Sequence, residues 1–288
     1  TATTVTTAKT TPPPPSVGMN PGGGGFFIKG ANYQMRLMGY AQAYGAIYDR
    51  DLNRTDGDGD FSVRRARVDW LADYYDDYQL LIEFDGGPGT SAAGSSDFAL
   101  VEARLNWRIA GDALQLRVGK FTTPFSHENW RSSRDIDTIE RYMLLNALFA
   151  LPALDVQYGV LLHGKLLADN ALGWFIGAFN GNGRANDNFS DDNNSKEVQA
   201  RLTYAFGKRL SIGAGFDLDD EQNQTLTLSD LGFNAYVSTP IRGQRIGYTA
   251  DLRWQEGPFM LSSEVTSFDF DTASDDTVDF DGGFVQLS

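Results

Sequence analysis

The sequence predicts an all-β protein, a transmembrane antiparallel β-barrel, and three observations lead to this fold class. From residue 26 onward apolar and polar residues alternate with period two, the pattern of a half-buried strand. The alternating runs reach about ten residues, which is the length that a tilted strand needs to cross a bilayer. Short and long connections also alternate along the chain, as they do in barrels with short turns on one side of a membrane and long loops on the other.

The composition narrows the function classes. The chain has 288 residues, 41% of them hydrophobic, and no run of about eighteen apolar residues that would predict a transmembrane helix. It has no cysteine and only two histidines, His127 and His163, so thiolate metal sites and histidine-based catalysis have little to build on. We therefore expect neither an enzyme nor a cofactor, and no nucleic-acid partner.

Twelve alternating runs account for residues 33–288. We expect strands at 33–48, 61–72, 77–85, 98–109, 113–121, 155–167, 171–180, 196–206, 209–218, 244–255, 258–268 and 280–288. The apolar face of each strand is expected to contact lipid, which offers no hydrogen bonds, and the polar face is expected to line a water-filled lumen. In strand 61–72, Arg65 and Arg67 have lumen parity. Arg64 has the opposite parity, so we expect it to snorkel at the membrane interface.

Two segments fall outside this pattern. Residues 1–25 are rich in Thr, Pro and Gly and are expected to form a disordered periplasmic tether, or alternatively a tail that binds the cell wall or a periplasmic partner. Residues 26–288 are expected to form the barrel, which looks incomplete at its C-terminus because residue 288 lies inside a strand-like run.

Residues 122–154 form the longest connection between two of the predicted strands apart from the acidic loops. Ile136, Ile139, Met143 and Ala147 have nearly helical spacing within it. Because the segment is too apolar for water, we expect it to fold into the lumen as a constriction loop. Arg131, Arg134 and Arg141 would then lie at the narrowest point. The alternative is an outer loop that contacts a neighbouring subunit.

The basic side chains of lumen parity are the main candidate site. Rows of guanidinium groups in a water-filled channel attract anions and bind phosphate through paired hydrogen bonds. By parity the set comprises Arg65, Arg67, Arg104, Arg108, Arg117, Lys165, Arg201, Arg245 and Arg253. Carboxylates such as Glu83 and Asp85 share the same face, so the alternative is structural ion pairing with weak selectivity.

Metal sites and catalytic groups have weaker support. Asp56, Asp58 and Asp60 in "TDGDGDF" offer oxygen ligands for Ca²⁺, but the full EF-hand spacing is absent, and a solvated acidic loop is the simpler interpretation. We expect no metal site. Such loops would instead bridge to lipopolysaccharide through divalent cations, as a hypothesis. His163 has lumen parity and is interpreted as a pore-lining residue.

Five short motifs carry a family resemblance. "FSVRRARVDW" at 61–70, "LRVGKFTTPFS" at 116–126, "ER" at 140–141, "GAFNGNG" at 177–183 and "GPFMLSSE" at 257–264 together resemble the phosphate-selective porins of Gram-negative outer membranes, porins O and P. The resemblance covers roughly residues 26–288.

This resemblance implies a sixteen-stranded and usually trimeric barrel, of which about twelve strands are visible here. It also implies that the loop after the fifth strand folds into the pore, and it gives pore roles to Arg64 or Arg65, Lys120 and Arg141. Lys120 has lipid-side parity by simple counting, so a bulge would have to re-aim it.

The expected function is that of an outer-membrane porin for passive diffusion of small hydrophilic solutes. The arginine set favours a preference for anions such as phosphate. The expected partners are outer-membrane lipid and lipopolysaccharide, small anions, and two further copies of the chain in a homotrimer. Two alternatives stay open: a structural, cell-wall-tethering or adhesive barrel with little ion selectivity, and a barrel enzyme that depends on His163.

Overall fold

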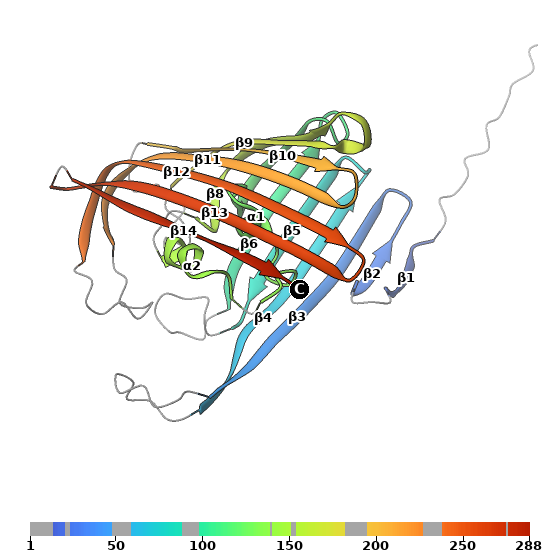
Figure 1. Cartoon of the computed structure of the whole chain (residues 1–288). Helices are drawn as coiled ribbons and strands as arrows, with labels where there is room; N and C mark the ends of the chain where they lie inside the picture. The colour runs from blue at the N-terminus through green and yellow to red at the C-terminus, as the bar shows by residue number, and fades with distance from the viewer. Residues whose placement is uncertain are drawn as a thin grey trace, which may run out of the picture.

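The computed structural model describes residues 14–20, 24–47, 59–87, 98–138, 140–150, 154–181, 195–226, 238–274 and 276–288. Within these ranges, fourteen strands form one antiparallel sheet in which each strand pairs with its neighbours in the sequence. The sheet is strongly curved (Figure 1). The alternation of apolar and polar residues therefore predicted the fold class correctly, because a two-residue period gives every strand one apolar and one polar face.

The first seven strands are β1 (Ser16–Met19), β2 (Phe26–Lys29), β3 (Tyr33–Ile47), β4 (Gly59–Tyr74), β5 (Tyr78–Asp85), β6 (Ala99–Arg108) and β7 (Gln115–Thr122). The others are β8 (Val156–Leu166), β9 (Leu172–Phe179), β10 (Glu197–Phe206), β11 (Leu210–Leu226), β12 (Thr239–Glu256), β13 (Phe259–Thr272) and β14 (Thr277–Leu287). The helices are α1 (His127–Trp130), α2 (Met143–Ala150) and a 3₁₀ turn η1 (Ala168–Asn170).

Strands β3 to β14 are the twelve predicted strands, but two of the expected loops are wrong. The ladder of β13 and β14 continues to the pair Asp271 and Thr277, so a tight turn replaces the long loop expected at 269–280. Strands β11 and β12 likewise extend into the loop expected at 219–243 and pair as far as Leu226 and Thr239. The backbone hydrogen bonds of a ladder continue here through polar residues that sequence patterning assigns to loops.

A further difference concerns the N-terminal segment. We expected no strand before residue 26, but β1 pairs with β2, with Ser16 opposite Lys29 and Met19 opposite Phe26. β2 in turn pairs with the first residues of β3. This short hairpin thus extends the sheet by two strands beside the first residues of β3. Residues 1–13 and 21–23 of the expected tether lie outside the described residues.

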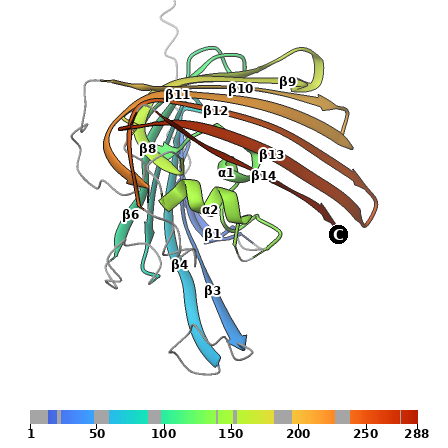
Figure 2. The ribbon, with the colours of Figure 1, turned by 60° about the vertical axis from the view of Figure 1, so that its left-hand side comes forward.

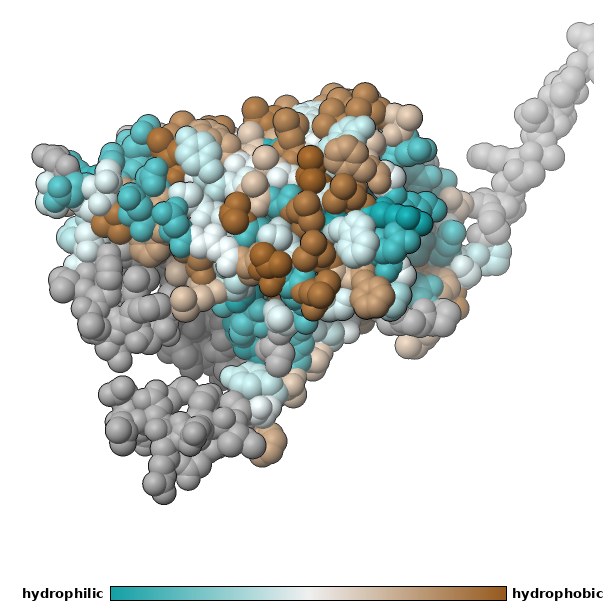
Figure 3. Space-filling model, in the orientation of Figure 1, coloured by the Kyte–Doolittle hydropathy of each residue, from teal (hydrophilic) through white to brown (hydrophobic). Residues whose placement is uncertain are grey.

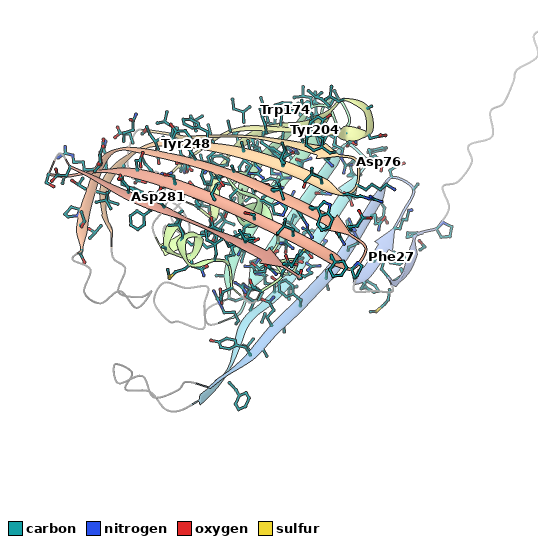
Figure 4. The ribbon with its side chains drawn as sticks, viewed as in Figure 1. Phe27, Asp76, Trp174, Tyr204, Tyr248 and Asp281 are labelled. Carbon is teal, nitrogen blue, oxygen red and sulfur yellow. The ribbon has the colours of Figure 1, made fainter. Side chains whose placement is uncertain are left out.

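The convex face of the sheet is apolar. Figure 3 shows apolar residues gathered across the middle of the visible outer face, with hydrophilic residues toward its two ends. Large side chains exposed on the sheet include Val68, Trp70, Leu105, Trp107, Val160, Ile176, Leu202 and Val265. Trp174, Tyr204 and Tyr248 also project from this outer side (Figure 4). An apolar surface of this extent is stable only against lipid or another protein.

No helix in the described part of the chain is long and apolar enough to cross a membrane.

The loop between β7 and β8 lies on the concave side of the sheet, where Figure 2 shows α1 and α2. The predicted helical spacing is only partly correct: α2 begins at Met143, Ile136 is buried outside it, and Ile139 is not among the described residues. The loop enters past Gly215, where a Cβ would lie 2.0 Å from the carbonyl oxygen of Phe125. Glycine at this position lets the loop backbone rest directly on β11.

Candidate functional site

One side of the β7–β8 loop is held by an apolar cluster. Leu145 and Leu148 of α2 are fully buried with Phe125 from the start of the loop and with Phe268 and Phe270 of β13. Burying aromatic and leucine side chains of this size stabilises a contact by roughly 1.5–3 kcal/mol each. The cluster therefore fixes the loop against β13 and fills that side of the interior.

Hydrogen bonds to β13 complete this anchor. Glu264 accepts hydrogen bonds from the backbone N–H of Glu128 at 3.0 Å and from the hydroxyl group of Tyr142 at 2.9 Å. Ser126 caps α1, since its Oγ accepts from the backbone N–H of Asn129 at 2.9 Å. All five residues lie within the interior, where satisfied polar groups fix one loop conformation.

The opposite side of the loop is joined to β3 and β4 by polar contacts. Arg134 Nη2 lies 2.5 Å from Asp69 Oδ2, and Gln42 Nε2 donates to the carbonyl oxygen of Ser133 at 3.1 Å. Arg64 and Arg65 both bind the carboxylate of Glu140. The loop thus crosses the interior from an apolar attachment on β13 to a charged attachment on β4.

A cavity of about 350 Å³ remains between the loop and the inner faces of β4 to β7. Six of the predicted arginines line it: Arg67, Arg104, Arg117, Arg131, Arg134 and Arg141. Four carboxylates line it as well: Asp69, Glu83, Glu102 and Asp155. Six guanidinium groups thus meet four carboxylates at its wall, and Asp85 and Asp137 outside the lining pair with Arg67 and Arg131. This cavity is the candidate functional site.

Two of these arginines are neutralised by carboxylates, Arg67 by residues of the neighbouring strand β5 and Arg104 by a residue of its own strand β6. Arg67 Nη1 lies 2.6 Å from Glu83 and its Nε lies 2.9 Å from Asp85, and all three side chains are buried. Arg104 Nε lies 2.9 Å from Glu102. These ion pairs stiffen the wall, so the alternative of structural pairing holds for these two residues.

Arg117 differs from its neighbours, because it has no carboxylate within ion-pair distance among the described residues. Its guanidinium carbon lies 5.0 Å from the ring centroid of Trp130 and 5.5 Å from that of Phe121, and its Nε is buried without a hydrogen-bond partner. Aromatic rings orient a guanidinium group but leave its N–H donors unsatisfied. Arg117 is therefore a cavity arginine whose charge is not neutralised by a carboxylate of the described residues.

The position predicted for Arg64 is wrong. The register of β3 and β4 pairs Gln42 with Arg65 and Ala43 with Val63, which leaves Arg64 as the extra residue of a β-bulge. The bulge turns the Arg64 side chain inward, where its guanidinium group binds Glu140 instead of snorkelling toward lipid. Parity counted along the chain fails at this point because a bulge shifts it by one residue.

Lys120 is not among the residues that line the cavity. Its strand partners are Ala103 and Tyr158, and its Nζ donates to the carbonyl oxygen of Leu100 at 3.1 Å. Lys120 is buried all the same, with its ammonium group 5.6 Å from the ring centroid of Tyr158. The Lys120 side chain is therefore not turned into the cavity, as the pore role implied by the family resemblance requires.

The other predicted basic residues lie away from the cavity. Arg201 pairs with Asp251 at 2.5 Å, and Arg253 contacts the sulfur of Met260 at 3.2 Å. Arg108 lines a second, polar cavity of about 410 Å³ near the β4–β5 turn, and Lys165 is exposed. Sequence parity alone therefore does not identify which of these cations share one site.

Arg245 lies at the centre of an acidic cluster on β10 to β12. Its guanidinium nitrogens lie 3.2 Å from Glu197, 2.9 Å from Asp217 and 3.5 Å from Asp219, and it also binds Glu221. Arg245 is completely buried. It is therefore a structural cation in this structure. The parity argument missed the cluster because Asp219 and Glu221 lie beyond residue 218, where the predicted strand ended, although β11 continues through them.

The weaker predictions for metals and catalysis concern other parts of the chain. Asp56 and Asp58, and the side chain of Asp60, lie outside the described residues, and the rest of the described chain holds no group of three or more Asp, Glu or His residues placed to bind a metal. His163 Nε2 lies 2.7 Å from Asn106 Oδ1, and its ring stacks on Phe175 with centroids 6.0 Å apart. Its Nε2 atom and one face of its ring thus contact neighbouring side chains.

His127 gives a pH prediction for the loop. Burial lowers the pKa of His127 to about 4; the attraction of Asp251 opposes this shift, and repulsion from Arg131, Arg201 and Arg253 adds to it. The unfolded chain takes up this proton near its ordinary pKa of about 6.5. The folded protein should therefore lose about 1–3 kcal/mol of stability as the pH falls from about 6.5 to about 4.

Urea unfolding in detergent micelles at pH 7 and pH 4.5 checks this prediction. The substitution His127→Gln should reduce the pH dependence, since glutamine does not titrate. An equal loss of stability on acidification in both proteins would contradict it.

Comparisons with known proteins identify the class of protein to which this chain belongs. A model of the phosphate-selective porin O and P family matches residues 38–288. The structure is similar to the outer membrane protein OmpT of Vibrio cholerae. Its loop L8 deletion mutant has a TM-score of 0.58 and 14% identity, with 88% of this chain and 76% of that chain covered. The in-vitro folded trimer form has a TM-score of 0.57 and 15% identity, with 88% and 71% covered.

A comparison with curated protein sequences gave no match. At identities of 14–15% the structural likeness shows the fold alone, that of an outer-membrane β-barrel. The family match and this fold together define an outer-membrane porin, a channel rather than an enzyme. The chain belongs to the phosphate-selective porin O and P family.

Proposed function

We propose that this porin prefers anions and that a small oxyanion such as phosphate binds in the cavity beside Arg117. The observation that carries the proposal is a buried guanidinium group that is oriented by Trp130 and Phe121 and has no carboxylate partner among the described residues. A permeating oxyanion can accept its hydrogen bonds. The carboxylates nearby weaken the binding enough for release.

The β7–β8 loop is the constriction in this proposal. It is attached to β13 by the apolar cluster and to β4 by ion pairs, so solutes pass through the cavity that it leaves along β4 to β7. Residues 1–15, which precede the hairpin of β1 and β2, act as a periplasmic tether. Three copies of the chain associate through their apolar outer faces. The trimer form among the similar structures supports that assembly. The same proposal includes contacts between the protein and the lipopolysaccharide of the outer membrane.

The test is a reversal potential in a planar bilayer under a KCl gradient, repeated with phosphate added to block the chloride current. The unmodified protein should prefer chloride and be blocked by phosphate. Arg117→Leu, which removes the charge, should weaken the block about tenfold, since one charge-assisted hydrogen bond contributes about 1.5–3 kcal/mol.

Lys208→Gln is the matched control for this experiment, because it removes one positive charge from the exposed β10–β11 turn. It should leave the block unchanged. A cation preference, or an equal block in Arg117→Leu, would contradict the proposal. Normal insertion without any conductance would favour the structural or adhesive alternative.

A further inference from the structure

A carboxylate of the protein itself occupies a paired-arginine site at the edge of the constriction. Arg64 donates from Nε to one oxygen of Glu140 and from Nη2 to the other at 3.2 Å. Arg65 Nη2 donates to the second oxygen at 3.4 Å. Two consecutive guanidinium groups thus hold one carboxylate through three hydrogen bonds.

The bulge in β4 creates this arrangement. Consecutive residues of a regular strand point to opposite faces, but the extra residue of the bulge lets Arg64 and Arg65 reach the same carboxylate. Arg65 is buried and is further fixed by a 2.8 Å hydrogen bond from its Nη1 to Gln42 Oε1. The donors are therefore preorganised by the strand and not by the loop.

The geometry is the one by which guanidinium groups recognise a free oxyanion. A planar fork of N–H donors binds two oxygens of a carboxylate or a phosphate, and a halide ion cannot match it with two parallel hydrogen bonds. The Glu140 side chain stands where such an anion would bind.

The exposure of its carboxylate separates this ion pair from the others in the wall, since the Asp69 side chain that pairs with Arg134 is only 3% exposed. The side chain of Arg64 is 26% exposed and that of Glu140 is 41% exposed. In the Arg67 pairs the side chains are 7% exposed for Arg67 and 0% for Asp85. A dissolved anion can reach and replace an exposed partner, whereas a buried partner is inaccessible to it.

We propose that Glu140 is a specificity-determining residue of this porin. Its carboxylate is an internal competitor that occupies Arg64 and Arg65 until an oxyanion displaces it. This inference rests on the proposed anion preference, to which it adds a second subsite and a reason for selecting oxyanions over halides. An oxyanion can bind only while Glu140 is away from the two arginines. Its apparent affinity is therefore the intrinsic affinity multiplied by the fraction of time that the two arginines are unoccupied.

The test measures the block of chloride current by phosphate and by acetate in planar bilayers, with bromide as the halide probe. Glu140→Gln removes the competing charge and should tighten the phosphate and acetate block about three- to tenfold. The effect on bromide should be smaller. Heat-modifiable mobility on a gel checks that each variant is folded.

Two variants separate this effect from simpler ones. Asp135→Asn makes the same change of charge in the same loop, and the Asp135 side chain is exposed with no ion pair in the described structure, so this variant should leave the block unchanged. Arg134→Gln cuts the other ionic link between the loop and β4, the contact with Asp69, without releasing Arg64 or Arg65. It should not tighten the block.

An equal block in Glu140→Gln and the unmodified protein would overturn the inference, and so would a tightening of the same size in Asp135→Asn or Arg134→Gln. A block that weakens in Arg117→Leu but does not change in Glu140→Gln would overturn this inference alone and leave the Arg117 site standing. A phosphate block that appears only in Glu140→Gln would support it.

Discussion

The substitution Arg245→Met is expected to destabilise the protein by at least about 3–5 kcal/mol, the cost of removing one partner from a buried ion pair. Arg245 is completely buried, and it contacts four carboxylates, those of Glu197, Asp217, Asp219 and Glu221. Without the guanidinium group, these carboxylates would face one another in an interior where water cannot solvate them. We expect most of the variant to fail to fold into detergent or lipid.

The yield of folded protein and the urea midpoint of unfolding in lipid vesicles measure this effect. Arg209→Gln is the control, since Arg209 pairs with Glu256 at 2.8 Å with side chains that are 70% and 44% exposed. Exposed pairs contribute about 0–1 kcal/mol. Adding Glu197→Gln to Arg245→Met should restore part of the stability. A midpoint unchanged in Arg245→Met would show that the cluster needs no cation.

Leu148→Ala is expected to weaken the packing of the β7–β8 loop against β13. Leu148 is fully buried in the apolar cluster with Phe125, Phe268 and Phe270. Truncating a buried leucine costs about 2–5 kcal/mol, including the cavity that it leaves. Because the cluster is the apolar attachment of the loop, that loss should appear as larger and noisier single-channel currents and as faster proteolysis within the loop.

Met143→Ala is the matched control, because Met143 begins the same helix but is 63% exposed. It should change neither the current nor the proteolysis rate. Quiet single-channel currents of normal size in Leu148→Ala would mean that the ion pairs to β4 hold the loop without the cluster.

Much of this architecture follows from local patterns. Alternation predicted β3 to β14 within a few residues at most boundaries, because the two faces of a strand meet different solvents along its whole length. It also predicted that Arg65 and Arg67 point inward, and both are buried there. The apolar loop was predicted to leave the water, and α2 is packed inside the sheet.

The composition of the site does not follow from such patterns. Whether a lumen arginine is neutralised depends on the register of neighbouring strands, which places Arg67 opposite Asp85 and leaves Arg117 against aromatic rings. Arg64 shows the same limit, because a single bulge reverses its side of the sheet. Glu140 reaches Arg64 across 76 positions of sequence, a distance that only the folded loop can close.

Strands β3 to β14, the apolar outer face and the presence of an inward loop are therefore properties of local sequence, since each depends on a residue and its near neighbours in the chain. The free donors of Arg117, the enclosed Arg245 and the Glu140 contact were decided by tertiary structure. Ion pairing and cavity formation depend on the distance between strands and the loop that crosses them, and that distance is set by packing and register.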